Sequence, residues 1–134
     1  MTAVFALEQT VYVEDTDYYG VVYHANYLKY FERARTQWLI ANGISLTECR
    51  DNDALFVIKD VQLQYHRPLH LHDQFIVTAL PRIRSRSSLV FEQTLFLAEN
   101  PEQVFTEGSI TLVAVNQQHR VIRVPTQIAS ILDD

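Results

Sequence analysis

Cysteine, glycine and proline are scarce in this sequence of 134 residues, and so is positive charge. With Cys49 as the one cysteine, no internal disulfide can form, which is compatible with a reducing cytoplasm. The net charge of −5 leaves no basic excess to neutralise the phosphates of a nucleic acid. No apolar run reaches the roughly 18 residues of a membrane span, and no secretory signal is visible. We therefore expect a cytoplasmic protein with no nucleic-acid partner and no membrane insertion.

The remaining composition is that of an ordinary globular protein, 48% hydrophobic and 20% charged. No internal repeat, low-complexity tract or linker divides the chain. A chain of 134 residues is long enough to bury a sizeable core of its own. We therefore predict one domain over residues 1–134.

The most informative stretch lies between residues 11 and 38. Alternating apolar residues predict a strand over 5–14, and a three- and four-residue apolar spacing predicts a helix over about 25–42. Three acids and Gly20 lie between these two elements, so the chain delivers Asp17 into a loop that leads to a helix start. The apolar face predicted for this helix consists of Tyr27, Phe31, Ala34, Trp38 and Ala41.

A loop carboxylate beside a helix start can perform acyl transfer to water. Asp17 can act as a base or a nucleophile, and free backbone amides at the helix start can stabilise an oxyanion on a neighbouring carbonyl. A purely structural role is also compatible with the spacing, because loop aspartates often accept hydrogen bonds from nearby amides or cap helices. The spacing alone leaves both roles open.

At these residues the sequence resembles the hot-dog-fold acyl-CoA thioesterases, in particular the Tol-Pal-associated branch and the 4-hydroxybenzoyl-CoA thioesterases. The matching segments are residues 15–17 (DTD), 20–24 (GVVYH), 26–27 (NY) and 31–35 (FERAR). The resemblance implies that Asp17 is the catalytic carboxylate and that His24 takes part, chiefly through its backbone amide. It further implies that the substrate-binding residues are Tyr18, Gly20, Val22, Tyr23 and Asn26. Tyr18 and Tyr19 depart from the small residues usual in the family, which bears on the size of the acyl group.

The resemblance implies an acyl-CoA substrate and no cofactor. Two alternatives stay open, a thioesterase that acts on acyl-carrier protein and a hot-dog dimer that binds acyl chains or a protein without turnover. His66, His70 and His72 invite a metal interpretation, but they straddle Pro68 without an acid or cysteine at ligand spacing. We therefore expect no metal.

The rest of the chain predicts an α+β protein, an antiparallel sheet of about five strands wrapped around one long helix. We predict residues 45–53 to be an irregular surface connection. On the second strand we expect Leu55, Val57, Val61, Leu63 and Tyr65 to share one face. The further predicted strands are 55–66, 74–83, 88–98 and 102–115, with a short extended segment at 121–124, a terminal helical turn over 126–132 and frayed residues at 133–134.

Three arginines follow one another at two-residue spacing near the end of a predicted strand. On extended backbone Arg82, Arg84 and Arg86 would point to one side, where an anion would relieve their repulsion. The phosphates of coenzyme A would suit them. A hairpin turn that spreads the three apart is the alternative, and it would break the row if it fell at Ser85.

Apolar residues on the sheet face that the helix does not cover predict self-association. We expect a homodimer, with a homotetramer as the alternative, and the resemblance places the active site at the dimer interface. The residues on which this expectation rests are Phe56, Ile58, Ile76, Val90 and Phe96.

Overall fold

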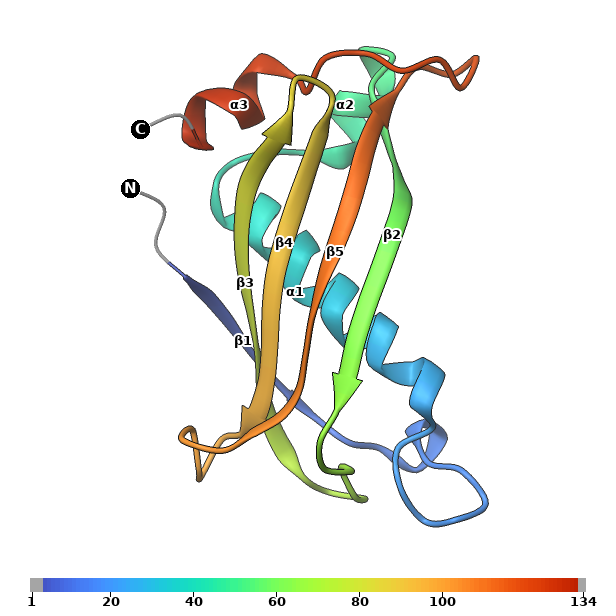
Figure 1. The fold of residues 1–134 in the computed structure, drawn as a ribbon, viewed down its shortest axis with the longest axis vertical. Helices are drawn as coiled ribbons and strands as arrows, with labels where there is room; N and C mark the ends of the chain where they lie inside the picture. Colours follow the sequence, from blue (N-terminus) through green and yellow to red (C-terminus); the bar gives the residue numbers. More distant parts are fainter. Residues whose placement is uncertain (1–3, 133–134) are drawn as a thin grey trace.

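In the computed structural model, which describes residues 4–132, a five-stranded antiparallel sheet wraps around one long helix (Figure 1). The strand order is β1-β3-β4-β5-β2, so β1 and β2 form the two edges. The strands are β1 (Phe5–Thr10), β2 (Leu55–Tyr65), β3 (Gln74–Ser85), β4 (Ser88–Leu97) and β5 (Val104–Val115). The helices are α1 (Tyr27–Ala41), α2 (Leu46–Asp51) and α3 (Thr126–Leu132), with the short 3-10 turns η1 (Val13–Asp15) and η2 (His24–Asn26). The predicted α+β architecture is confirmed.

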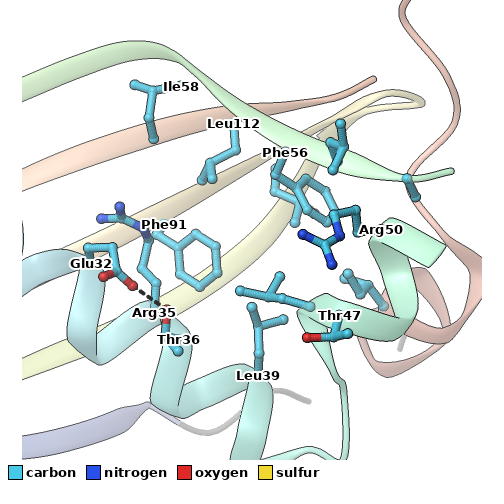
Figure 2. A pocket seen from close by; sticks show the side chains of 15 residues that line it. Glu32, Arg35, Thr36, Leu39, Thr47, Arg50, Phe56, Ile58, Phe91 and Leu112 are labelled. Atoms are coloured by element: carbon cyan, nitrogen blue, oxygen red, sulfur yellow. Dashed lines mark hydrogen bonds between the residues drawn. The ribbon is translucent and has the colours of Figure 1, made fainter. Parts of the chain in front are cut away.

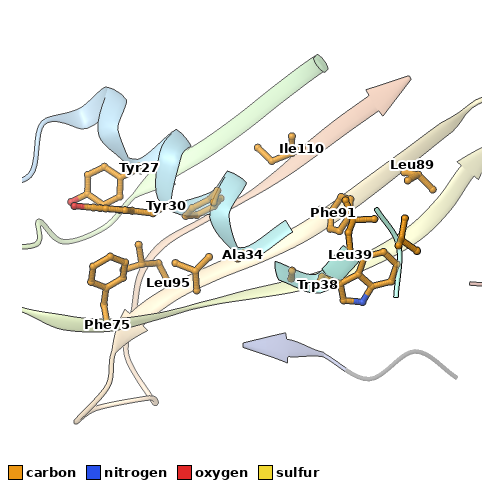
Figure 3. Close-up of a cluster of buried hydrophobic side chains, with 14 of the residues drawn as sticks. Tyr27, Tyr30, Ala34, Trp38, Leu39, Phe75, Leu89, Phe91, Leu95 and Ile110 are labelled. Atoms are coloured by element: carbon orange, nitrogen blue, oxygen red, sulfur yellow. The ribbon is translucent and has the colours of Figure 1, made fainter. Parts of the chain in front are cut away.

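The core lies between α1 and the concave face of the sheet (Figure 3). Tyr30 packs its ring 4.6 Å from that of Phe75, and Trp38 packs 5.8 Å from Phe91. The predicted apolar face of the helix is confirmed except at Ala41, which is exposed. Ala41 is the last helical residue, and Gly43 ends the helix with φ +73°, donating its amide to Ile40.

The region from β1 to α2 differs from the prediction at two element ends and in one segment, and the other strand ends differ by one or two residues. The first strand stops at Thr10 rather than at 14, because the chain turns into η1, where Val13 is 71% exposed. Helix α1 begins at Tyr27, after η2, rather than at 25. The segment predicted as irregular, 45–53, contains α2, whose first turn is capped by the Ser45 hydroxyl accepting from the Glu48 amide.

A β-bulge in β2 changes which side chains face the helix. Ile58 pairs with Leu112 and Asp60 with Thr111, so one residue is left without a partner on β5. Phe56 and Ile58 therefore lie on the same face as Leu63, against the prediction that Leu55 and Val57 share that face. Phe56 and Ile58 are thus turned toward α1 and do not belong to the uncovered outer face.

None of the helices within residues 4–132 is both long and apolar enough to cross a membrane.

Candidate active site

The loop between β1 and α1 folds back on itself as a small hairpin. Thr16 and Val22 form an isolated antiparallel bridge, and the amide of Asp17 donates to the carbonyl of Val21 over 2.9 Å. The Gly20 amide closes the turn by donating to the Asp17 carbonyl over 3.1 Å. Gly20 has φ +82°, and a Cβ at this position would meet no atom within 4 Å, so the backbone conformation rather than space requires glycine.

Asp15 and Asp17, two residues apart, have different environments. Asp15 is 6% exposed and accepts hydrogen bonds from the amide of Tyr12 over 2.9 Å and from the side-chain amide of Asn26 over 3.0 Å. Its backbone carbonyl also accepts from the Tyr23 amide. Asp15 therefore ties η1 to the start of α1 and has no carboxylate oxygen free for chemistry.

Asp17 is partly exposed and holds the turn with one oxygen only. Its Oδ1 accepts from the amide of Tyr19 over 2.8 Å, and no partner for Oδ2 is found within residues 4–132. Asp17 also lies within electrostatic reach of the helix, since burial raises the pKa of Tyr27 and the Asp17 charge adds to this shift. Asp17 therefore has the structural role of accepting a loop amide through Oδ1, and its Oδ2 remains available to act as a base or a nucleophile.

The helix start offers backbone amides close to this loop. The amide of Val22 donates to Leu69 and that of Tyr23 to Asp15, whereas the amide of His24 has no acceptor in the part of the chain described. The carbonyl of His24 is held in turn by the Tyr65 hydroxyl of β2 over 2.9 Å. The first unoccupied amide after the loop is therefore that of His24. The carbonyl of the same peptide group, that of Tyr23, accepts from the Asn26 amide over 2.8 Å, and Tyr65 holds the following peptide group.

The predicted substrate-binding residues fall into two groups. Tyr18 and Tyr23 are 95% and 49% exposed, and Gly20 is exposed at the turn of the loop. Val22 and Asn26 are instead 3% and 8% exposed, and their side chains support the loop from within. Sequence reasoning missed the supporting roles of Asp15 and Tyr65, although a tyrosine on the core-facing side of an edge strand is a signal that its hydroxyl reaches a polar partner.

The three arginines do not gather around Asp17 within one chain. Arg82 is on the outer face of β3 and pairs with Glu92 over 3.1 Å, while Arg86 is in the two-residue turn to β4, beyond Ser85. The turn therefore interrupts the row of three arginines at Arg86, one residue later than the turn at Ser85 that the sequence allowed. The loop packs near the other end of β3, so roughly 30 Å of extended strand separates Arg84 from it.

The three histidines of residues 66–72 do not converge on one point. His66 Nε2 lies 2.8 Å from an oxygen of Glu107, His70 bridges to Val21, and His72 has φ +72° in the turn before β3. No cluster of three metal-ligating side chains is present within residues 4–132.

A sheet wrapped around one helix, with a carboxylate on the loop that leads to a free amide at the helix start, defines a protein of the hot-dog thioesterase class. The chain belongs to the thioesterase superfamily, whose family model matches residues 19–103. A thioesterase is an enzyme, so the predicted enzyme class is confirmed as well.

Individual relatives agree with this assignment. The acyl-CoA thioester hydrolase YbgC of Escherichia coli is 36% identical over 116 residues, which cover 86% of this chain and 84% of the relative. The acyl-CoA thioesterase YbgC of Haemophilus influenzae is 39% identical over 68% of each chain. A solved 1,4-dihydroxy-2-naphthoyl-CoA thioesterase from Synechocystis superposes with a TM-score of 0.90 at 21% identity, covering 97% of this chain and 96% of that one. This superposition confirms the hot-dog fold.

Proposed function

We propose that this thioesterase hydrolyses acyl-CoA thioesters, with Asp17 as the catalytic carboxylate and the His24 amide as the oxyanion donor. The observation that carries the proposal is the free Oδ2 of Asp17 on the loop that leads directly to the free amide of His24. Named relatives over most of the chain length support the acyl-CoA substrate.

Two routes fit these groups. In the first, Asp17 removes a proton from water as the water oxygen attacks the thioester carbonyl, and the carbon–sulfur bond then breaks to release the acid and the CoA thiol. In the second, Asp17 attacks the carbonyl directly and expels the CoA thiolate. Water then hydrolyses the mixed anhydride, which regenerates the Asp17 carboxylate and supplies the proton that the thiolate takes up. In both routes the His24 amide donates to the oxygen on which negative charge develops.

The test is thiol release from a panel of short, long and aromatic acyl-CoAs by the native chain and by Asp17→Asn. The substitution keeps the shape of the side chain and removes its basic oxygen, so turnover should fall by at least about 100-fold with the fold intact. Glu14→Gln is the matched control, since Glu14 is an exposed acid of the same cluster, and it should leave turnover unchanged. Equal activity of native chain and Asp17→Asn would overturn the assignment, and turnover only of acyl-carrier-protein thioesters would overturn the CoA substrate.

A homodimer through the free edge of β2 is part of this proposal. The outer edge of β2 has no pairing strand within residues 4–132, and it carries Val57, Ile58 and Val61 at 41%, 50% and 40% exposure. Antiparallel pairing of two copies of β2 would cover these side chains. Sedimentation should detect the dimer, and Val57→Lys should shift it toward monomer. A native chain that sediments as a monomer at all concentrations would contradict this interface, and a tetramer would point to a second one.

We propose that the arginines of one subunit contact the phosphates of a coenzyme A bound at the loop of the other subunit. In an antiparallel β2 pair the Arg84 end of one copy lies toward the loop end of the other, which is the support for this proposal. Arg84→Gln and Arg86→Gln should raise KM for acyl-CoA and leave KM unchanged for the matching N-acetylcysteamine thioester, which has no phosphate. Equal changes for both substrates would remove the arginines from the CoA site.

We propose the cytoplasm as the compartment of this activity. The support is Cys49, which is 2% exposed and unpaired within residues 4–132, as expected for a protein that needs no disulfide. Fractionation of the source cells with an antibody against the chain would test the location, and recovery in an extracellular fraction would contradict it.

A further inference from the structure

A second feature, separate from the loop, is a pocket of about 530 Å³ between α1, α2 and the concave face of the sheet (Figure 2). This volume is within the range of small-molecule sites. Its floor and walls are mostly apolar side chains, among them Leu39, Phe56, Leu89, Phe91 and Leu112. Two arginines interrupt this apolar lining, and both are visible in the close-up.

Arg35 is a buried cation in the wall of this pocket. It is 9% exposed, and its Nη1 donates to the side-chain oxygen of Gln93 over 3.1 Å. Gln93, 1% exposed, is fully committed, because its amide nitrogen donates to the carbonyls of Phe31 and Thr78. Burial lowers the pKa of Arg35 to about 10, so the guanidinium stays charged at neutral pH. No carboxylate within 4 Å neutralises it among the described residues.

Arg50 lies on the opposite side of the pocket, in the last turn of α2, with its guanidinium toward the interior (Figure 2). Glu32 is the one acid of the lining, and it is bonded to the hydroxyl of Thr36 on its own helix. The pocket thus has two positive groups, one negative group and a wide apolar surface between them. Such a surface suits an apolar chain that ends in an anion.

We propose that this pocket binds the acyl group of the substrate and selects acyl groups that carry a carboxylate at the end remote from the thioester. Arg35 binds this carboxylate together with Arg50, and the apolar side chains between them contact the methylene groups. This inference rests on the proposed acyl-CoA thioesterase function and names its substrate class.

In this proposal the pocket of one subunit binds the acyl group of a substrate whose thioester lies at the Asp17 loop of the other subunit. Within one chain no residue from 17 to 27 lines the pocket, and the rings of Tyr27 and Tyr65 pack 5.2 Å apart beside the helix start. The pocket instead adjoins β2 at Ile58, which is 50% exposed. Antiparallel pairing of two β2 strands about Val61, with residue 59 outside the ladder at the bulge, would set residue 56 of one copy opposite residue 65 of the other. The helix start at His24, whose carbonyl Tyr65 holds, then lies beside the pocket of the partner.

Binding can be measured without catalysis through Trp38, the only tryptophan of the chain. Its ring packs 5.8 Å from Phe91 in the pocket wall, so a ligand there should change its fluorescence. Hexanoate presents a carboxylate on an apolar chain, and hexanamide is its neutral match. Hexanoate should bind at least about 10-fold more tightly than hexanamide, as hydrogen bonds to a charged partner predict, and Arg35→Met should remove the difference. Equal binding of the two probes, or no fluorescence change with either, would overturn the proposal.

Catalysis supplies the second measurement, the ratio of kcat/KM for adipyl-CoA to that for hexanoyl-CoA. These substrates have the same carbon count and differ in the terminal carboxylate. The ratio should fall by about 10-fold in Arg35→Met and in Arg50→Met, and it should be unchanged in Arg123→Met, an exposed arginine outside the pocket. Arg50→Met keeps the test decisive if Arg35→Met fails to fold, because Arg50 is on an exposed helix.

The two proposals fail in different ways. Hydrolysis of both CoA esters with a ratio that no substitution changes would overturn the pocket and leave the thioesterase standing. Arg35-dependent binding of hexanoate by a chain that hydrolyses no thioester would overturn the acyl-CoA activity and leave an anion-selective pocket.

Discussion

The hydroxyl of Tyr65 donates a 2.9 Å hydrogen bond to the backbone carbonyl of His24, although the two residues are 41 positions apart. This bond joins the edge strand β2 to the helix start that carries the proposed oxyanion donor. Burial raises the pKa of Tyr65, so the hydroxyl keeps its proton at neutral pH. The turn η2, which carries the proposed donor at its first residue, is therefore held through the adjoining peptide group by the same strand that is proposed to form the dimer.

Removing this hydrogen bond should lower catalysis more than stability. Tyr65→Phe loses one hydrogen bond, worth about 1 kcal/mol, and frees the peptide group that follows His24, so the neighbouring His24 amide is held less firmly. We expect kcat to fall about 3- to 10-fold with KM nearly unchanged, because the amide acts on the transition state. Steady-state kinetics of Tyr65→Phe beside Tyr12→Phe, whose side chain is 63% exposed, would measure the effect. Equal kcat in both variants would mean that the peptide is held without Tyr65.

Some features of this fold can be predicted from the sequence and others cannot, and particular residues show why. The strand, loop and helix around Asp17 are local patterns, and the sequence predicts them to within a few residues. It does not predict the bulge after Ile58, since one extra residue in a strand leaves no compositional mark and depends on pairing with β5. The same holds for the distance of Arg84 from Asp17, which the strand register sets.

The sequence contains an indication that Arg35 and Gln93 are buried polar residues, and the prediction of the site did not use it. Arg35 follows Phe31 by four residues and precedes Trp38 by three, so it lies on the apolar face of the helix. Gln93 lies between Phe91 and Leu95 on the core face of its strand. Two polar residues at buried positions each need a partner, and they bond to one another. Their meeting across 58 positions could be seen only in the structure.

Substitution of Asp15 should mainly lower the stability of the fold, whereas substitution of Asp17 should mainly lower activity. Asp15→Ala removes the acceptor of the Tyr12 and Asn26 hydrogen bonds and leaves both donors unpaired, so we expect a loss of about 2–4 kcal/mol in the free energy of unfolding. Asp17→Asn should lose less than about 1 kcal/mol, because its carboxylate is partly exposed. Urea unfolding at one fixed protein concentration measures both. Equal midpoints for the two variants would refute the division of roles.

Gly20 and Gly43 form a matched pair for testing the shape of the loop. Both have positive φ, +82° and +73°, and a Cβ added at either position would meet no atom within 4 Å. Gly20→Ala and Gly43→Ala should therefore cost the same backbone strain, about 1 kcal/mol. Only Gly20→Ala should reduce kcat, by about 10-fold or more, since it shifts Asp17 against the His24 amide. If both variants keep full turnover, the loop need not hold Asp17 precisely.

Tyr30 should make the fold sensitive to alkali. Its side chain is fully buried, and burial together with the neighbouring Asp15 carboxylate raises the pKa of its hydroxyl above the ordinary value of about 10. Asp15 and Asn26 are its polar neighbours, yet the hydroxyl makes no hydrogen bond of normal geometry within residues 4–132. The native state thus keeps a proton that the unfolded chain releases above pH of about 10.

The sign of the effect follows from this difference in bound protons. Above pH of about 10 the native state binds more protons than the unfolded chain at Tyr30, so the free energy of unfolding falls as pH rises, by about 1.4 kcal/mol per pH unit. Tyr30→Phe has no hydroxyl to titrate at this position, so its free energy of unfolding does not fall for this reason. The opposite contribution of Arg35, whose pKa is lowered to about 10, is common to both proteins and cancels in their difference. Urea unfolding from pH 7 to 11 should therefore give a constant difference up to about pH 9 and then a growing advantage for Tyr30→Phe. Curves that stay parallel throughout would show that Tyr30 titrates alike in both states.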